Sequence, residues 1–264
     1  AAAEAPNPAG APSVKTVMAG IRRKLRDRKP SRKHPMTRDR LERLLSVLPT
    51  DTVSGARDRA LILMCFALAL RSSEAVSFNV SHVTIDRAGA TISLPYSKTD
   101  QAGEGEVYRI KRRPRGDALC VVVALERWIK YIQEVDRWRR TRDTLLSKRA
   151  TARHPDISLF RALNVIGGLT SRRLDAESVG YILKGLVRQA REAGVWDPKA
   201  DGRLSDYGSH SLRAGFVTTA YAKNMPEWQI QKVTRHKSTA VLRSYNRQQG
   251  VDKTAAIDEV LDGG

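Results

Sequence analysis

The sequence is poor in cysteine, has no long apolar run and carries few acidic residues beside its many basic ones. Its only cysteines, Cys65 and Cys120, lie inside apolar stretches, so we expect buried thiols rather than a disulfide, as is usual in a reducing cytoplasm. The longest apolar run, residues 60–70, falls short of the roughly 18 residues that a membrane span requires, and it suits a buried helix. The N-terminus lacks the charged, apolar and small-residue order of a signal peptide. These absences predict a cytoplasmic protein with no membrane partner.

Two familiar kinds of cofactor site are also missing from the sequence. It contains no glycine-rich P-loop, and no acidic cluster with the spacing of metal ligands stands out. We therefore expect neither a cofactor nor a metal ion, and any chemistry would come from the side chains themselves.

The shortage of acidic residues leaves a large positive charge. The chain has 47 Lys and Arg against 28 Asp and Glu, which gives a formal charge of +19. A field of this size favours a polyanionic partner, and nucleic acid is the commonest one in solution. Composition alone leaves open a merely basic protein of the ribosomal type.

Composition also divides the chain. Residues 1–13 are rich in Ala, Pro and Gly, and a run of basic residues follows over 22–33. We assign residues 1–31 to a flexible, basic linker, with the tail of an N-terminal DNA-binding domain as the alternative. Residues 32–264 form one domain with enough apolar residues for a core. Because the chain begins with alanine, we expect it to be a fragment of a longer protein.

Apolar periodicity predicts a mainly α domain with a small antiparallel β-sheet or hairpin, an α+β fold. Alternation over residues 90–94 and 106–110 predicts two strands joined by a polar loop. Residues 137–153 are dense in arginine and poor in apolar residues, so we expect an exposed connection there, followed by a short strand over 157–160. The predicted helices cover residues 37–48, 57–70, 119–135, 175–193, 210–223, 226–235, 239–247 and 253–261.

Four side chains in the last quarter of the chain suggest phosphoryl transfer to a tyrosine. His210 and Arg213 are three positions apart, which places them on one face of a helix, and His236 and Tyr245 follow. Histidine moves protons near neutral pH, arginine holds a phosphate through two parallel hydrogen bonds, and tyrosine acts as a covalent nucleophile.

With two further motifs, these residues resemble the tyrosine recombinases, the phage-integrase family of site-specific DNA recombinases. The resemblance covers roughly residues 35–264 and implies the catalytic-domain fold of that family. The family pattern consists of an arginine box, a lysine on a β-hairpin, an H-x-x-R box, a later histidine and a tyrosine. Here it corresponds to Ala69–Glu74 (ALRSSE), Lys98, His210–Arg213, His236 and Tyr245.

The resemblance implies a role for most of these side chains. Arg71 and Arg213 would clamp the scissile phosphate, because each guanidinium offers a planar fork that lysine lacks. Tyr245 would attack the phosphorus atom. His210 would accept the tyrosine proton or hold the phenol in line, and His236 would donate a hydrogen bond to the phosphate. The plainer readings are an ion-paired arginine at position 71 and a core aromatic at position 245.

Two further residues take auxiliary roles by the same resemblance. Lys98 would be the general acid that protonates the departing 5′ oxygen, with Lys111 as the other candidate if the strand register is misread. Glu74 would orient Arg71 or a histidine, and a surface glutamate is the plainer reading.

Two positions depart from the family pattern. Ala69 stands where glycine often precedes the Leu-Arg pair, and Arg235 stands where glycine commonly precedes the later histidine. Neither change removes a chemical group. Arg235 would either constrain the turn or add a phosphate contact.

The implied activity is DNA strand cleavage and rejoining on double-stranded DNA through a 3′-phosphotyrosyl intermediate, without metal or ATP. Four protomers would assemble on two DNA sites and exchange strands through a Holliday junction. The segment 253–261 would dock on a neighbouring protomer, or alternatively on its own core. A type IB topoisomerase is one rival, although those enzymes tend to have lysine in place of His210. A basic DNA-binding regulator with an inactive site is the other.

Overall fold

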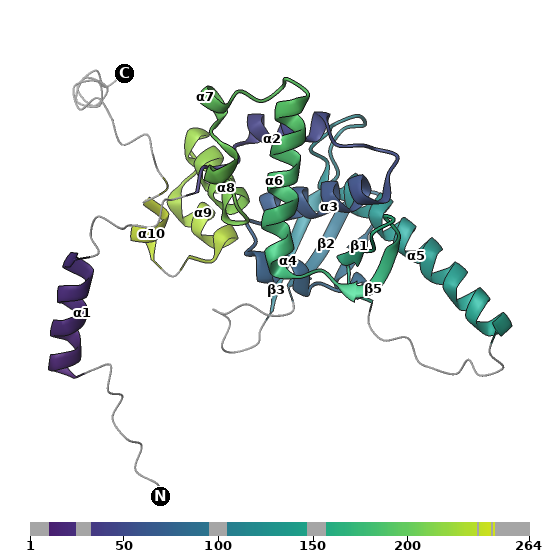
Figure 1. Cartoon of the computed structure of the whole chain (residues 1–264), viewed down its shortest axis with the longest axis horizontal. Helices are drawn as coiled ribbons and strands as arrows, with labels where there is room; N and C mark the ends of the chain where they lie inside the picture. Colours follow the sequence, from purple (N-terminus) through teal and green to yellow (C-terminus); the bar gives the residue numbers. More distant parts are fainter. Residues whose placement is uncertain are drawn as a thin grey trace, which may run out of the picture. The chain divides into compact units, whose positions relative to one another are not determined.

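Two units make up the described part of the chain, and the first is a single helix. The computed structural model describes residues 11–24, 33–94, 105–146, 157–236, 238–243 and 245. Contacts divide the chain into residues 1–32 and residues 33–264 (Figure 1). In the first unit, α1 (Pro12–Lys24) follows the apolar spacing of Val14, Val17 and Ile21.

The second unit is mainly helical, as the sequence predicts, with two small antiparallel sheets. Its strands are β1 (Val83–Ile85), β2 (Gly89–Leu94) and β3 (Glu106–Lys111) in one sheet, and β4 (Arg161–Leu163) and β5 (Leu169–Arg173) in the other. Its helices are α2 (Arg38–Ser46), α3 (Val53–Ala67), α4 (Ser72–Ser77), α5 (Val121–Leu146), α6 (Ala176–Glu192), α7 (Pro198–Asp201), α8 (His210–Ala222), α9 (Glu227–Thr234) and α10 (Thr239–Arg243). None of the described helices is long and apolar enough to cross a bilayer.

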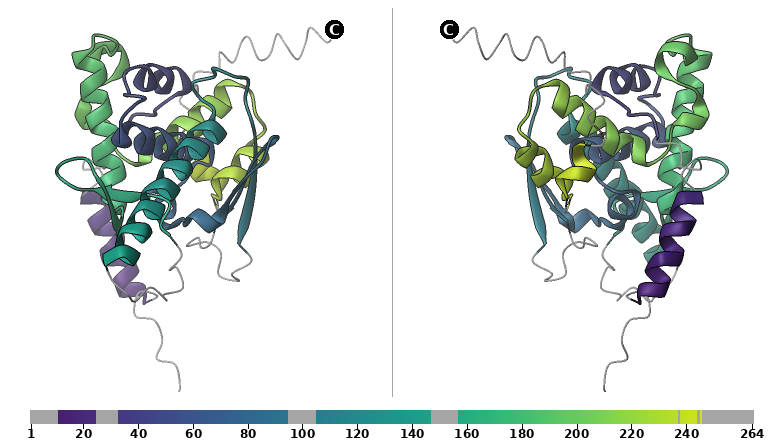
Figure 2. Two further views of the ribbon diagram at one scale, coloured as in Figure 1. Left: turned by 90° about the vertical axis from the view of Figure 1, so that its right-hand side faces the viewer. Right: turned by 90° about the vertical axis from the view of Figure 1, so that its left-hand side faces the viewer.

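Helix α3 is the centre of the core. Its residues 60–65 are each at most 2% exposed, because the helix is apolar on all sides and packs against α5, α6 and α8. Trp128 of α5 is fully buried as well, and its indole N–H donates to the Leu159 carbonyl at 2.7 Å. The three-stranded sheet and α6 lie on opposite sides of this unit, with helices between them (Figure 2). Both cysteines are buried and free.

The predicted hairpin is confirmed as β2 and β3. Their register pairs Leu94 with Glu106 beside the connecting loop and Gly89 with Lys111 at the far end. A Cβ atom on Gly89 would lie 2.0 Å from the Ile110 carbonyl oxygen, so the close approach of the strands requires glycine there. The short β1 adds a third strand that the sequence pattern does not reveal.

Two predicted boundaries are wrong. The expected connection over 137–153 is helical as far as Leu146, because arginine is a good helix former and Asp136 pairs with Arg139 one turn later at 3.8 Å. Residues 147–156 lie outside the described part. The expected strand over 157–160 forms only the Asn79–Ser158 bridge, and the regular strand begins at Arg161.

A buried ion pair joins β4 to α5 and gives the first test. The Arg161 guanidinium donates to both Asp136 carboxylate oxygens at 2.9 and 3.0 Å, and both residues are buried. Asp136→Ala leaves a buried guanidinium without its counter-charge, so we expect it to lower the free energy of unfolding by about 3–5 kcal/mol in urea denaturation. The exposed Arg38–Glu42 pair is the control, and Glu42→Ala should cost under about 1 kcal/mol. Equal effects of the two substitutions would contradict this account.

Candidate active site

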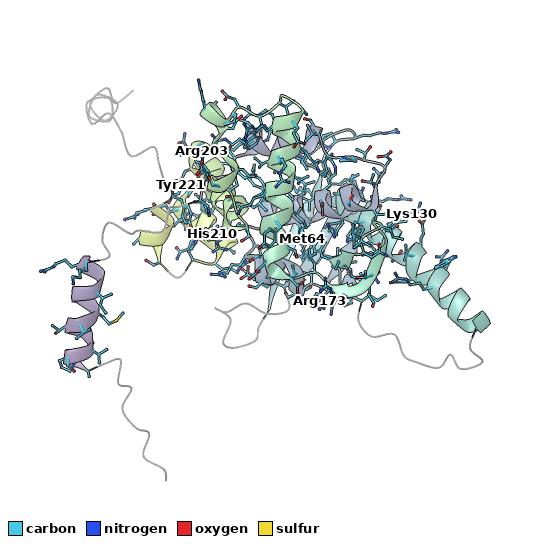
Figure 3. The ribbon with its side chains drawn as sticks, in the orientation of Figure 1. Met64, Lys130, Arg173, Arg203, His210 and Tyr221 are labelled. Atoms are coloured by element: carbon cyan, nitrogen blue, oxygen red, sulfur yellow. The ribbon has the colours of Figure 1, made fainter. Side chains whose placement is uncertain are left out.

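Six of the predicted site residues come together from segments far apart in the sequence. They lie in the turn after α3, in the first turn of α4, at the start of α8, just after α9 and just after α10. Figure 3 shows His210 where α8 begins, close to the ribbon of α9 and α10. The residues are Arg71, Glu74, His210, Arg213, His236 and Tyr245.

Arg213 is the link between these segments. Its guanidinium donates to the Ala69 carbonyl at 2.6 Å and to the Thr234 carbonyl, and the residue is 1% exposed. Guanidinium has five N–H donors, so these two bonds leave others for an anion. Burial, followed by the charge of Arg71, lowers the pKa of Arg213 to about 10. Because Arg213 is so enclosed, direct contact with a phosphate requires a local rearrangement.

Arg71 is held at the start of α4 by Glu74. The chain turns through Ala69 at φ 47°, a left-handed conformation that explains why glycine suits this position, and Arg71 follows as the N-cap of α4. The Glu74 carboxylate accepts from the Arg71 backbone N–H at 2.8 Å and from its guanidinium at 2.6 Å. Glu74 thus contacts Arg71, one of the residues that the resemblance would have it orient. The Arg71 side chain stays 32% exposed, so an incoming anion meets it first.

The phenol of Tyr245 lies against His210. The distance from its oxygen to His210 Nε2 is 2.5 Å, although the two residues are 35 positions apart. Partial removal from water, with the charges of Arg213 and Arg71, lowers the pKa of His210. The imidazole is therefore neutral at pH 7 and able to accept a proton.

Other tyrosines near the H-x-x-R box have different surroundings. Tyr221 donates to Glu227 at 3.2 Å, and Tyr207 is fully buried with its hydroxyl on the Asp201 carbonyl. Burial raises the pKa of each phenol to about 12. Tyr245 is only half-buried, where it packs beside Leu242 and Ile230. Of these three tyrosines, Tyr245 is the one whose hydroxyl contacts His210.

His236 completes this side of the site. Its Nδ1 lies 2.8 Å from the Thr234 hydroxyl, and its ring centroid lies 5.9 Å from that of Tyr245. Burial, followed by the positive charge of Arg213 and Arg71, lowers the pKa of His236 to about 4. The ring is thus neutral at pH 7 and, with Nδ1 at the Thr234 hydroxyl, can present Nε2–H to an anion.

Comparison with known proteins shows the family of the chain. The sequence model of the phage integrase family matches residues 34–250. The chain belongs to the phage integrase family. It is 30% identical over 256 residues to the integrase/recombinase xerD homolog of Selenomonas ruminantium, across 97% of this chain and 66% of that protein.

Solved structures of the family share the fold. The Tn1549 transposon integrase in complex with transposon right end DNA has a TM-score of 0.56 at 19% identity, over 95% of this chain and 77% of that one. The XerH site-specific recombinase, bound to palindromic difH substrate in a post-cleavage complex, has a TM-score of 0.54 at 20% identity, over 86% and 54% of the two chains. The chain thus spans about two thirds of its curated relative and about half of XerH.

Arg235 is the residue whose importance the family pattern does not predict. It occupies a left-handed conformation at φ 56° that costs a non-glycine residue on the order of 1 kcal/mol. Its guanidinium donates to Glu74 at 2.7 Å and to the Tyr108 hydroxyl, and its side chain is 8% exposed. The sequence left open whether Arg235 constrains the turn or adds a phosphate contact, and the structure shows a constrained turn. Only the unusual residue type before His236 could have drawn attention to it.

The predicted general acid, Lys98, lies outside the described residues. The alternative, Lys111, pairs with Gly89 at the end of β3 away from the loop. Its side chain lines a groove rather than the site around Tyr245. In the sequence, Lys98 falls between Leu94 of β2 and Glu106 of β3, and its assignment stays a prediction.

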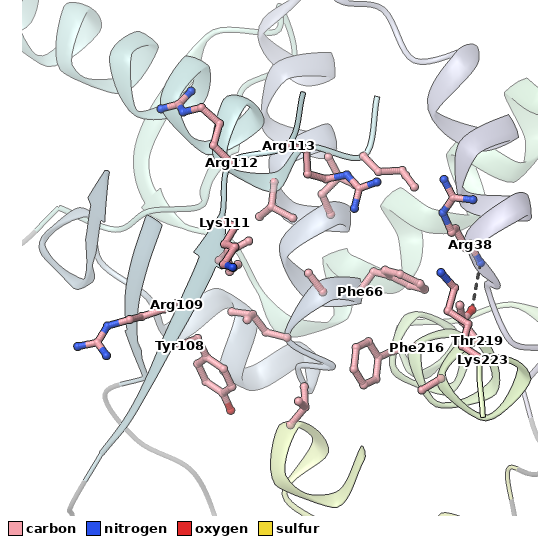
Figure 4. A pocket seen from close by; sticks show the side chains of 18 of the residues that line it. Arg38, Phe66, Tyr108, Arg109, Lys111, Arg112, Arg113, Phe216, Thr219 and Lys223 are labelled. Atoms are coloured by element: carbon pink, nitrogen blue, oxygen red, sulfur yellow. Dashed lines mark hydrogen bonds between the residues drawn. The ribbon is translucent and has the colours of Figure 1, made fainter. Parts of the chain in front are cut away.

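That groove, of about 910 Å³, lies between β3, the end of α3 and helix α8 (Figure 4). Phe66 and Phe216 meet edge to face in it, with ring centroids 6.2 Å apart. Basic side chains surround this apolar floor, as Figure 4 shows for Arg38, Arg109, Lys111, Arg113 and Lys223. The groove therefore suits an apolar segment with acidic flanks.

The low pKa of His236 makes stability depend on pH. The unfolded chain takes up this proton near pH 6.5, whereas the folded site resists it down to about pH 4. Stability should therefore fall as the pH drops from about 6.5 towards 4. Between pH 7 and pH 5, we expect the urea midpoint of unfolding to fall less in His236→Gln than in the unsubstituted chain. Equal losses in the two proteins would show that the imidazole is not held neutral.

Proposed function

We propose that this chain is the catalytic part of a site-specific DNA recombinase that cleaves and rejoins double-stranded DNA through Tyr245. Family membership supports the reaction class. The observation that carries the proposal is the contact of the Tyr245 hydroxyl with His210 Nε2 at 2.5 Å, beside two arginines. A nucleophile, a neutral base and a cationic clamp thus occupy one site.

The chemistry follows from these positions. The Tyr245 oxygen attacks the phosphorus atom and gives its proton to His210, while the bond from phosphorus to the 5′ oxygen breaks. The product is a 3′-phosphotyrosyl ester and a 5′ hydroxyl. One phosphate ester replaces another, so a 5′ hydroxyl from a second duplex can reverse the step without ATP.

Charge in the site favours the transition state. Arg71 and Arg213 supply fixed positive charge where the pentavalent phosphorus gathers negative charge, and His236 adds a neutral donor. Single donors of this kind contribute about 3–4 kcal/mol to a barrier. The departing 5′ oxygen needs a proton, and we assign its donation to Lys98 on the sequence pattern.

Assembly is the second part of the proposal. We propose that four protomers act on two DNA sites, with residues 253–261, which lie outside the described part of the chain, docking on a neighbour. The C-terminal stretch 251–264 carries four acidic residues against one lysine, together with Ile257, Val260 and Leu261. This composition is complementary to the apolar floor and basic rim of the groove in Figure 4.

Covalent trapping tests the chemistry. We expect the chain to form a protease-sensitive adduct with members of a pool of nicked duplexes whose cores are randomised, because the nick lets the 5′ hydroxyl strand diffuse away. Tyr245→Phe should form none, since it lacks the attacking oxygen. Sequencing of the trapped DNA would also define the target.

Tyr221→Phe is the matched control and should keep the adduct, because its hydroxyl contacts Glu227 instead. An adduct that survives Tyr245→Phe would contradict the proposal. Relaxation of supercoiled DNA without exchange between two trapped duplexes would indicate a topoisomerase.

Removal of residues 251–264 tests the assembly. We expect the shortened chain to form adducts on single duplexes but to lose the paired four-protomer complex in light scattering. Lys223→Glu, a charge reversal at the rim of the groove, should weaken the same complex, because acidic residues would then face a carboxylate. Unchanged pairing in both variants would refute docking through this segment.

A further inference from the structure

We propose that Arg235 is a positioning residue that holds the phosphate-clamping turn and the catalytic hairpin in register. The inference deepens the proposed function and rests on it. Arg235 directly precedes His236, and its guanidinium reaches two elements far away in the sequence. It pairs with Glu74 of α4 at 2.7 Å and donates to the Tyr108 hydroxyl of β3.

The contact with Glu74 connects Arg235 to the clamp. One carboxylate oxygen of Glu74 accepts from the Arg71 guanidinium at 2.6 Å, and the other accepts from Arg235 and from the Arg71 backbone. A single buried carboxylate therefore lies between two guanidinium groups. Without Arg235, the Glu74 carboxylate is bonded to Arg71 alone and can move together with it.

The contact with β3 connects Arg235 to the hairpin. Tyr108 and Glu106 lie at the start of β3, next to the loop, and the Tyr108 hydroxyl lies 2.7 Å from the Glu106 carboxylate. The Arg235 guanidinium is 3.5 Å from the same carboxylate and 5.5 Å from the centre of the Tyr108 ring. The strand that leaves the loop is thus fixed to the segment that carries His236.

Backbone conformation supports a demand for this side chain. Arg235 ends α9 at φ 56°, which glycine adopts without strain and which other residues adopt at a cost. An arginine in this left-handed conformation indicates that its side chain makes contacts that glycine cannot make. The planar fork meets that need, since its two terminal nitrogens donate to Tyr108 and Glu74 separately, whereas an ammonium group has a single nitrogen.

Direct phosphate binding is the rival role, and the geometry disfavours it. The side chain is 8% exposed and is directed at protein carboxylates rather than outward. Arg71, by contrast, is 32% exposed. We therefore assign Arg235 an effect on the rate of cleavage rather than on DNA affinity.

The test compares four variants in single-turnover cleavage of the nicked duplex selected by trapping. Arg235→Gly keeps a permitted backbone and should slow cleavage on the order of 10–100-fold at saturating DNA, because small misplacements of catalytic groups have effects of this size. Arg235→Lys should recover little of the rate. Tyr108→Phe, which removes only the hydroxyl, should slow cleavage less. Arg203→Gly removes an exposed arginine as the control and should cleave normally.

Two readouts separate positioning from a structural or DNA-binding role. The double variant Arg235→Gly/Tyr108→Phe should be no slower than Arg235→Gly, since both remove the same contact. The dissociation constant of Arg235→Gly for DNA, and its salt dependence, should match those of the unsubstituted chain. All rates are corrected for the folded fraction, measured by circular dichroism.

Several outcomes would overturn the inference. One is normal cleavage by Arg235→Gly, and another is an additive double variant. A third is a salt slope lower by about one, which marks a lost phosphate contact. Failure of the unsubstituted chain to form any adduct would instead overturn the proposed function, and this inference with it.

Discussion

The two hydrogen bonds from the Arg213 guanidinium to backbone carbonyls hold the site together. Ala69 lies 144 positions before Arg213 and Thr234 lies 21 positions after it. The first carbonyl belongs to the turn that presents Arg71, and the second closes the helix that precedes His236. Helix α8 itself carries His210 to Tyr245. One buried side chain therefore sets the relative positions of Arg71, His210 and Tyr245, the proposed clamp, base and nucleophile.

The site contains more positive charge than its acidic side chains neutralise. The charge of Arg71 is among the causes that lower the pKa of His210, Arg213, Arg235 and His236. Glu74 offsets part of this charge at Arg213 and Arg235, while burial and the remaining positive charge keep His210 and His236 neutral. The remaining positive charge would stabilise a negatively charged transition state once a local rearrangement opens Arg213 to the DNA. The same field disfavours further protons, so acid should weaken both folding and activity.

The sequence was informative where chemistry is local or ordered along the chain. The helical fold, the hairpin, the burial of Cys65 and the grouping of His210 with Arg213 follow from periodicity and spacing. The extension of α5 to Leu146 did not follow from the sequence, because the ion pairs of Asp136 with Arg139 and Arg161 outweigh a low apolar content. Nor did the role of Arg235, whose partners Glu74 and Tyr108 are 161 and 127 positions away.

The most direct measurement is a structure of the chain trapped on DNA with vanadate in place of the scissile phosphate. We expect the Tyr245 oxygen to be an apical ligand of vanadium, with the guanidinium groups of Arg71 and Arg213 on its equatorial oxygens. Arg213 must therefore become accessible to the vanadate, because it is buried in the structure without DNA. Vanadate bound elsewhere, with the Tyr245 hydroxyl still on His210 and remote from the DNA, would contradict the account.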